Sequence, residues 1–128
     1  ILKYYSFENY FLNPGIMVQI GVIEEEEQFY RILFQKWQEY LHRLRSGRHL
    51  LEVIGKELKS VEDIKYYMEE IKTYLRGHNL FDIFYGPFKK NENELLRRYI
   101  ELADRAEFDD ILTQIDHFFY FENRRKTK

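Results

Sequence analysis

The residues best suited to bind a charged ligand lie in one short stretch, His42-Arg43-Leu44-Arg45-Ser46-Gly47-Arg48-His49. Arginine makes paired contacts with phosphate oxygens, and a helix that begins after a break exposes N–H groups to the same ligand. We therefore predict weak phosphate contacts by Arg43, Arg45 and Arg48, of the kind made to a nucleic-acid backbone. The alternative is structural, because the dipole of a preceding helix also favours basic residues at its end.

The sequence carries no other recognisable catalytic or metal-binding pattern. Its glycines stand singly and form no phosphate-binding loop, so these residues contain no recognisable ATP site. The chain has no cysteine, and its histidines do not form the H-E-x-x-H zinc pattern. Glu24 to Glu27 are adjacent on an expected helix and point in different directions, so they do not converge on an ion. We predict no catalytic residue, no metal site and no cofactor in this chain.

Aromatic residues cluster around Gly86-Pro87, at Phe81, Phe84, Tyr85 and Phe88. Rings at this density fill a hydrophobic core, and that is the interpretation we favour. The same rings would also suit a partner-protein surface. Base stacking is the third alternative, although single-strand readers interleave basic residues with their rings, and only Lys89 and Lys90 follow here.

The composition of the chain limits the classes of protein to which it can belong. The chain has 128 residues, which is the size of one ordinary domain, and its 45% hydrophobic content excludes a disordered chain. A formal net charge of −2 provides no overall attraction to polyanions, so any nucleic-acid contact must be local. No segment approaches the roughly 18 apolar residues of a membrane-spanning helix, and no signal peptide is recognisable. We expect a cytoplasmic protein that does not contact the membrane.

Apolar residues recur at three- and four-residue steps along most of the chain, which is typical of helices with one inward face. A long helix is predicted from Ile23 to Leu44, with Trp37 inward, and a break with a left-handed cap at Ser46-Gly47. The later helices are expected over residues 50–59, over 60–77 with a cap at Ser60, over 91–103 with a cap at Asn91, and over 108–122.

These patterns predict an all-α fold, an antiparallel bundle of about five helices. No two-residue alternation persists, so only Ile1 to Tyr5 is a possible strand or extended entry, followed by a short helix that Asn13-Pro14-Gly15 ends. We expect residues 1–122 to form a single domain and residues 123–128 to be a basic tail.

The segment Tyr5-Ser6-Phe7-Glu8-Asn9-Tyr10-Phe11-Leu12-Asn13-Pro14 resembles the ENYLL-x-P segment of OLD-like ATPase and TOPRIM nuclease proteins, which follows the nuclease core. The resemblance rests on Phe7, Glu8, Asn9, Tyr10 and Pro14, with Phe11 in place of the usual Leu. It implies a parent protein that cleaves nucleic acid with magnesium and ATP, often in defence. The ATP and metal sites would then lie upstream of this chain, and none of the family's metal-binding acids is assigned to a position here.

The resemblance favours one functional hypothesis, a non-catalytic helical C-terminal segment of a larger ATP-dependent TOPRIM-type nuclease. Because the chain opens at Ile1 inside an apolar run, we expect it to be a piece of a longer protein whose upstream domain is its partner. The alternative is a stand-alone helical domain for protein–protein interaction or oligomerisation. An independent enzyme is the third hypothesis, which the missing catalytic patterns disfavour.

Overall fold

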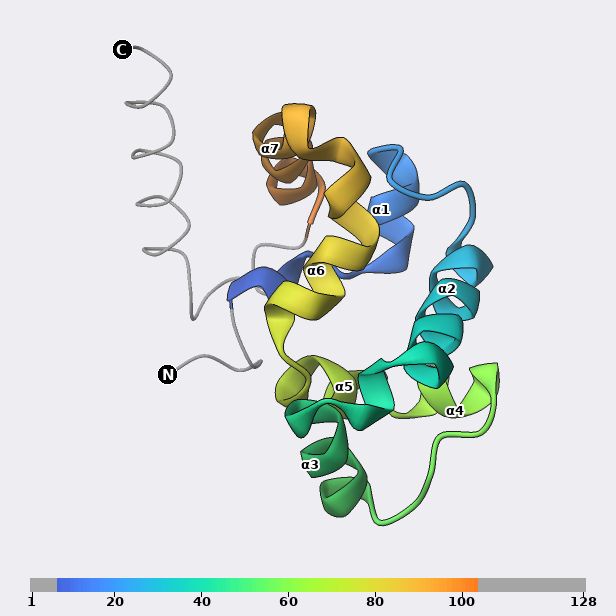
Figure 1. Cartoon of the computed structure of the whole chain (residues 1–128). Helices are drawn as coiled ribbons and strands as arrows, with labels where there is room; N and C mark the ends of the chain where they lie inside the picture. Colours follow the sequence, from blue (N-terminus) through green and yellow to red (C-terminus); the bar gives the residue numbers. More distant parts are fainter. Residues whose placement is uncertain (1–6, 104–128) are drawn as a thin grey trace.

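The computed structural model describes residues 7–103, and every regular element in that range is helical. Figure 1 shows α6 running through the middle, with α7 and α1 near one end and α3, α4 and α5 towards the other. In chain order the elements are the 3₁₀ helix η1 (Phe7–Phe11), α1 (Pro14–Gln19), α2 (Glu26–Glu39), the 3₁₀ helix η2 (Leu41–Arg43), α3 (Arg45–Ile54), α4 (Val61–Tyr66), α5 (Met68–Tyr74), α6 (Gly77–Tyr85), the 3₁₀ helix η3 (Gly86–Asn91) and α7 (Glu92–Leu102).

The all-α prediction is therefore confirmed: the chain is a helical bundle. The predicted strand over residues 1–5, the cap at Ser6, the helix over 108–122 and the tail over 123–128 lie outside the described residues.

The side chain of Asn9 in η1 is buried completely, among apolar residues. Its Nδ2 group donates hydrogen bonds to the backbone carbonyls of Lys72, at 2.7 Å, and Leu75, at 2.9 Å. These carbonyls belong to the C-terminal end of α5, where the last carbonyls of a helix lack intrahelical partners. The Asn9 amide therefore ties the first described segment of the chain to the end of a helix more than sixty residues later.

The same segment is also bonded to the two later helices. The Tyr85 hydroxyl on α6 donates to the Phe11 carbonyl at 2.6 Å, and the Asn13 N–H donates to the Tyr99 hydroxyl on α7 at 2.8 Å. Burial, and secondarily the nearby Tyr99, raise the pKa of Tyr85 well above its ordinary value, so its hydroxyl stays protonated and keeps donating. Residues 9–13 thus hold α5, α6 and α7 together.

The apolar faces of these helices enclose one core. Trp37 is buried with 4% exposure, as predicted from the stripe on α2, and the Phe29 ring stacks on the Phe84 ring at 4.7 Å between centroids. Phe84 and Tyr85 are buried and Phe81 is half-buried, in agreement with the core interpretation of this aromatic cluster. The largest fully buried side chains are Tyr85, Tyr99, Phe11, Phe29, Leu12, Met17, Leu33, Leu41, Leu50, Ile64 and Ile71.

Asn13-Pro14-Gly15 was predicted only to end a short helix. In the structure these residues also begin the next helix, α1, which corrects that prediction. Asn13 is the N-cap of α1, and its Oδ1 atom accepts hydrogen bonds from the N–H groups of Gly15, at 2.9 Å, and Ile16, at 3.4 Å. Pro14 occupies the first helical position, where its missing N–H costs nothing.

The predicted break at Ser46-Gly47 is wrong, because α2 already ends at Glu39 and Ser46 and Gly47 lie in the first turn of α3. Gly47 does not have a positive φ and is not a left-handed cap. A Cβ atom at this position would lie 2.0 Å from the Leu41 carbonyl oxygen. The glycine is needed there because the start of α3 packs directly on the backbone of η2.

Two further boundaries differ from the predicted ones. Gly55, expected inside a helix, has φ of 72° and is the left-handed cap that ends α3. Gly77, expected to close a helix, is instead the first residue of α6. The cap at Ser60 is confirmed, since its Oγ accepts from the Asp63 N–H at 3.1 Å. Asn91 stands at the N-cap of α7 but makes no side-chain capping bond.

Replacing Asn9 with Ala should destabilise the chain, because two carbonyls at the end of α5 would lose their buried donor. We expect the free energy of unfolding to fall by about 2 to 4 kcal/mol in chemical denaturation. Gln35→Ala is the matched control, since its amide bonds only the exposed Glu39 carboxylate and should cost less than about 0.5 kcal/mol. Similar losses from both variants would contradict the role of Asn9.

Replacing Gly47 with Ala should separate α3 from η2, because the new methyl group overlaps the Leu41 carbonyl. We expect a loss of about 3 kcal/mol in the free energy of unfolding. Gly86→Ala serves as the control: its Cβ would meet only the movable Asp82 carboxylate, at 3.1 Å, and stability should change little. An unchanged thermal midpoint for Gly47→Ala would show that the close approach is not present.

Candidate phosphate-binding pocket

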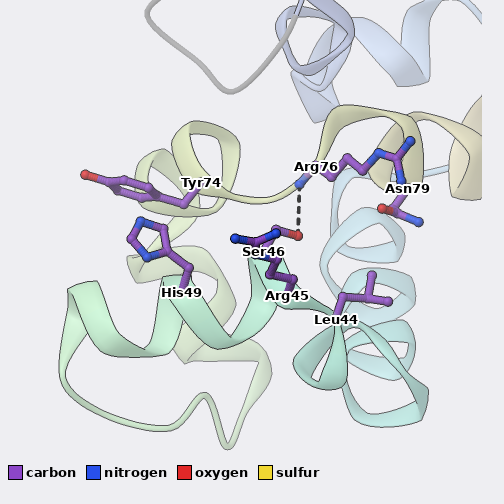
Figure 2. Close-up of a pocket in the computed structure, with 7 residues that line it drawn as sticks. All are labelled: Leu44, Arg45, Ser46, His49, Tyr74, Arg76 and Asn79. Carbon is purple, nitrogen blue, oxygen red and sulfur yellow. Dashed lines mark hydrogen bonds between the residues drawn. The ribbon is translucent and has the colours of Figure 1, made fainter.

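A pocket of about 480 Å³ lies where the first turn of α3 meets the corner between α5 and α6. Figure 2 shows the rings of His49 and Tyr74 on one side of it, Arg76 and Asn79 on the other, and Ser46 between them. None of the lining residues carries a carboxylate; they are Leu44, Arg45, Ser46, His49, Tyr74, Arg76 and Asn79.

Two helices begin at this pocket, and within residues 7–103 neither start has a side-chain cap or an acidic residue in its first turn. The N-cap residues are Leu44 for α3 and Arg76 for α6, and neither makes a side-chain capping bond. Neither helix has an acidic residue in its first turn, whereas α4, which begins elsewhere, has Glu62 and Asp63 there. Since the start of a helix carries a partial positive charge, both starts favour an anion in the space between them.

Arg45 and Arg76 add full positive charges to the lining of this pocket. Neither guanidinium makes a hydrogen bond or ion pair with any residue in the described range 7–103. The other arginines of that range are all engaged: Arg31 with Glu25, Arg43 with the Glu39 carbonyl, Arg48 with the Arg43 carbonyl, Arg98 with the Gln19 carbonyl, and Arg97 with a partner of its own. The two available guanidiniums therefore both line this pocket.

Ser46 joins the two helix starts across the pocket. Its Oγ atom accepts a hydrogen bond from the Arg76 backbone N–H at 3.3 Å (Figure 2). Because the oxygen acts as the acceptor in this bond, the hydroxyl hydrogen is left to donate to a ligand.

The His49 and Tyr74 rings form the aromatic wall of the pocket. Their centroids are 5.4 Å apart and the planes meet at 74°, an edge-to-face arrangement. The Nδ1 atom of His49 is 4.0 Å from the Glu52 carboxylate, and both side chains are largely exposed. This wall can pack against a flat group that enters beside the arginines.

Arg43, Arg45 and Arg48 were predicted to contact phosphate together, and of the three only Arg45 lines this pocket. Arg45 lines the pocket, but Arg43 Nη2 donates to the Glu39 carbonyl and Arg48 Nε donates to the Arg43 carbonyl at 3.1 Å. Arg43 and Arg48 thus bond backbone carbonyls around η2, at the junction of α2 and α3. Whether any of the three arginines binds nucleic acid stays a prediction.

Arg76 and its neighbours were missed by sequence reasoning. Residues 75–78 read Leu-Arg-Gly-His, and residues 44–49 read Leu-Arg-Ser-Gly-Arg-His. In each string a Leu-Arg pair stands at a helix start with a glycine one or two residues later, and neither helix has a side-chain cap or an acidic residue in its first turn. This sequence pattern, shared by residues 44–49 and 75–78, was the signal from which the pocket could have been predicted.

A second cavity of about 330 Å³ lies beside Trp37, and it has a different character. His42 is held there by its Nδ1 atom, 2.7 Å from the Trp37 carbonyl oxygen, and Glu57 is another lining residue. A single carboxylate and a bonded histidine give this cavity no positive charge to attract a phosphate.

The family-like residues have structural roles where the structure describes them. Asn9 and Tyr10 are buried, Glu8 is half-buried, and Pro14 begins α1. Within residues 7–103 no three histidine or acidic side chains gather as metal ligands would. No helix of that range is both long and apolar enough to cross a membrane.

Comparison with known proteins adds no identification: no family model, curated protein or solved structure matches the chain. The resemblance to TOPRIM nuclease proteins therefore stays a prediction.

Proposed function

We propose that this chain is a non-catalytic helical module that binds phosphate groups of nucleic acid in the pocket between α3 and α6. The observation that carries the proposal is that Arg45 and Arg76 both line a pocket at two uncapped helix starts, while their guanidiniums have no partner in the described residues. A positive side chain at a positive helix end is unfavourable by a few tenths to about 1 kcal/mol, and an anion between the two helices reverses that cost.

The remaining donors of the pocket suit a phosphate. The Ser46 hydroxyl and the Asn79 amide add neutral donors beside the guanidinium forks, which bind phosphate oxygens in pairs. Because the whole chain has a formal charge of −2, affinity depends on this local arrangement and not on overall charge.

The resemblance of residues 5–14 supports placing this module in a larger ATP-dependent TOPRIM-type nuclease, as its C-terminal part. Magnesium and ATP would act in the upstream domain, and the module would contribute binding. Burial of Asn9 and Tyr10 supports a structural task for the family-like segment, which anchors the bundle. The alternative, a helical protein-interaction domain, stays a prediction. The large apolar residues that are exposed in the described range, Val53, Tyr66 and Leu102, lie on three different helices.

The double variant Arg45→Gln/Arg76→Gln should abolish binding to a single-stranded oligonucleotide. For wild type, about two phosphate contacts predict a slope of log affinity against log salt near −1.4. Arg43→Gln/Arg48→Gln removes the same charge from adjacent positions outside the pocket and should keep that slope. Fluorescence anisotropy at several salt concentrations measures both, and circular dichroism verifies that each variant is folded.

Equal loss of binding in the two double variants would mean that general charge, and not the pocket, attracts the oligonucleotide. Absence of binding by the wild-type chain at low salt would refute the proposed function outright.

A further inference from the structure

We infer that the cavity beside Trp37 binds an alkylammonium group, which is a positively charged amine on an apolar chain. The cavity lies among the last turn of α2, η2, α3 and the loop between α3 and α4 (Figure 1). Its lining residues are Trp37, Gln38, His42, Leu51, Glu57 and Leu58. It shares none of them with the pocket between α3 and α6, so an ammonium site here is independent of the phosphate site proposed above.

His42, which lines the cavity, is held in the tautomer whose second ring nitrogen is an acceptor. Its Nδ1 atom lies 2.7 Å from the Trp37 carbonyl oxygen. A carbonyl oxygen only accepts hydrogen bonds, so Nδ1 carries the hydrogen, and Nε2 of the neutral ring keeps its lone pair. Nε2 has no hydrogen-bond partner within residues 7–103, and it is therefore available to a ligand that donates.

Glu57 gives the lining its negative charge. It supplies the one carboxylate among the described residues that line the cavity, and none of these residues is a lysine or an arginine. Within residues 7–103 the Glu57 carboxylate makes no hydrogen bond or ion pair. The neighbouring Lys56 does not neutralise it, because the Lys56 Nζ atom lies 3.3 Å from Asp63 Oδ1 instead. The lining therefore favours a cation over a neutral ligand or an anion.

The acceptors of the lining match an ammonium group in number. An ammonium group has three N–H donors, and a guanidinium has five. The lining offers the Glu57 carboxylate, Nε2 of His42 and the side-chain carbonyl of Gln38, which makes no side-chain hydrogen bond within the described residues. Three acceptors satisfy an ammonium group, whereas a guanidinium would keep donors without partners.

The apolar residues of the lining suit the chain that carries the ammonium group. Trp37 and Leu58 are buried, and Leu51 is half-buried. A lysine-like chain of about four carbons packs along such a surface while its charged end stays beside the carboxylate. The volume of about 330 Å³ lies at the lower end of the 300 to 1,000 Å³ range of small-molecule sites, so the ligand is small.

The test titrates the ¹⁵N-labelled wild-type chain at about pH 7.5, where histidine side chains are ordinarily neutral. The ligands are n-butylammonium chloride, Nα-acetyl-lysine amide and 1-butanol, the uncharged match for butylammonium, all at constant ionic strength. Trp37 is the single tryptophan of the chain, so its indole N–H signal reports on this cavity. We expect saturable shifts of that signal with the ammonium ligands, in the millimolar range expected for ligands of so few atoms, and none with 1-butanol.

Glu57→Gln should weaken ammonium binding about tenfold, because the variant keeps the size of the side chain and loses its charge. Glu52→Gln is the matched control, since it removes the same charge from an exposed position on α3 that does not line the cavity. It should leave the affinity unchanged. Circular dichroism verifies that both variants are folded.

The two ammonium ligands distinguish the sources of the group. Tighter binding of the acetyl-lysine amide would assign the site to a lysine side chain of a polypeptide, and tighter binding of butylammonium would assign it to a free amine. Both results support the ammonium site. Absence of a saturable shift at Trp37 with either amine, or an equal response to 1-butanol, would overturn it. Equal losses in Glu57→Gln and Glu52→Gln would also overturn it, because general charge would then attract the amine.

Discussion

The buried amide of Asn9 is the interaction on which the rest of the arrangement depends. A helix that ends in a protein interior leaves carbonyls without partners, and each unsatisfied group costs about 1 to 3 kcal/mol. Asn9 removes that cost for α5 by donating to the carbonyls of Lys72 and Leu75. Its own Oδ1 atom is buried with no partner in the described residues, so the two donated bonds must outweigh this cost.

The position of the pocket follows from this end of α5. Leu75 is the C-cap of α5, and Arg76 is already the N-cap of α6, so the corner between the two helices is very short. Fixing the Leu75 carbonyl fixes the place at which Arg76 emerges, and its N–H then meets Ser46 on α3. On the opposite side, Gly47 lets α3 begin directly on η2, which brings Arg45 to the same place. A buried amide and one glycine thus position the two helix starts that line the pocket.

The sequence pattern predicted those features of the structure that depend on interactions within a single helix. The inward stripe that places Trp37 in the core and the cap at Ser60 are set by side-chain spacing within one helix, and both were predicted. Helix ends set by the packing of one helix on another were not predicted: Gly47 resembles a helix terminator until the Leu41 carbonyl is known to lie against it. The pocket that Arg45 and Arg76 both line was missed for the same reason, since the two residues start different helices that come together only in the folded chain.

The central claim is that the starts of α3 and α6 form one anion site. A ¹⁵N-labelled chain titrated with inorganic phosphate, with the backbone amide shifts followed by NMR, tests this most directly. The account predicts that the largest shift changes occur at residues 45–49 and 76–79 together, and that one dissociation constant fits both segments. Shift changes in only one of the two segments, or centred on other basic residues such as Lys89 and Lys90, would contradict it.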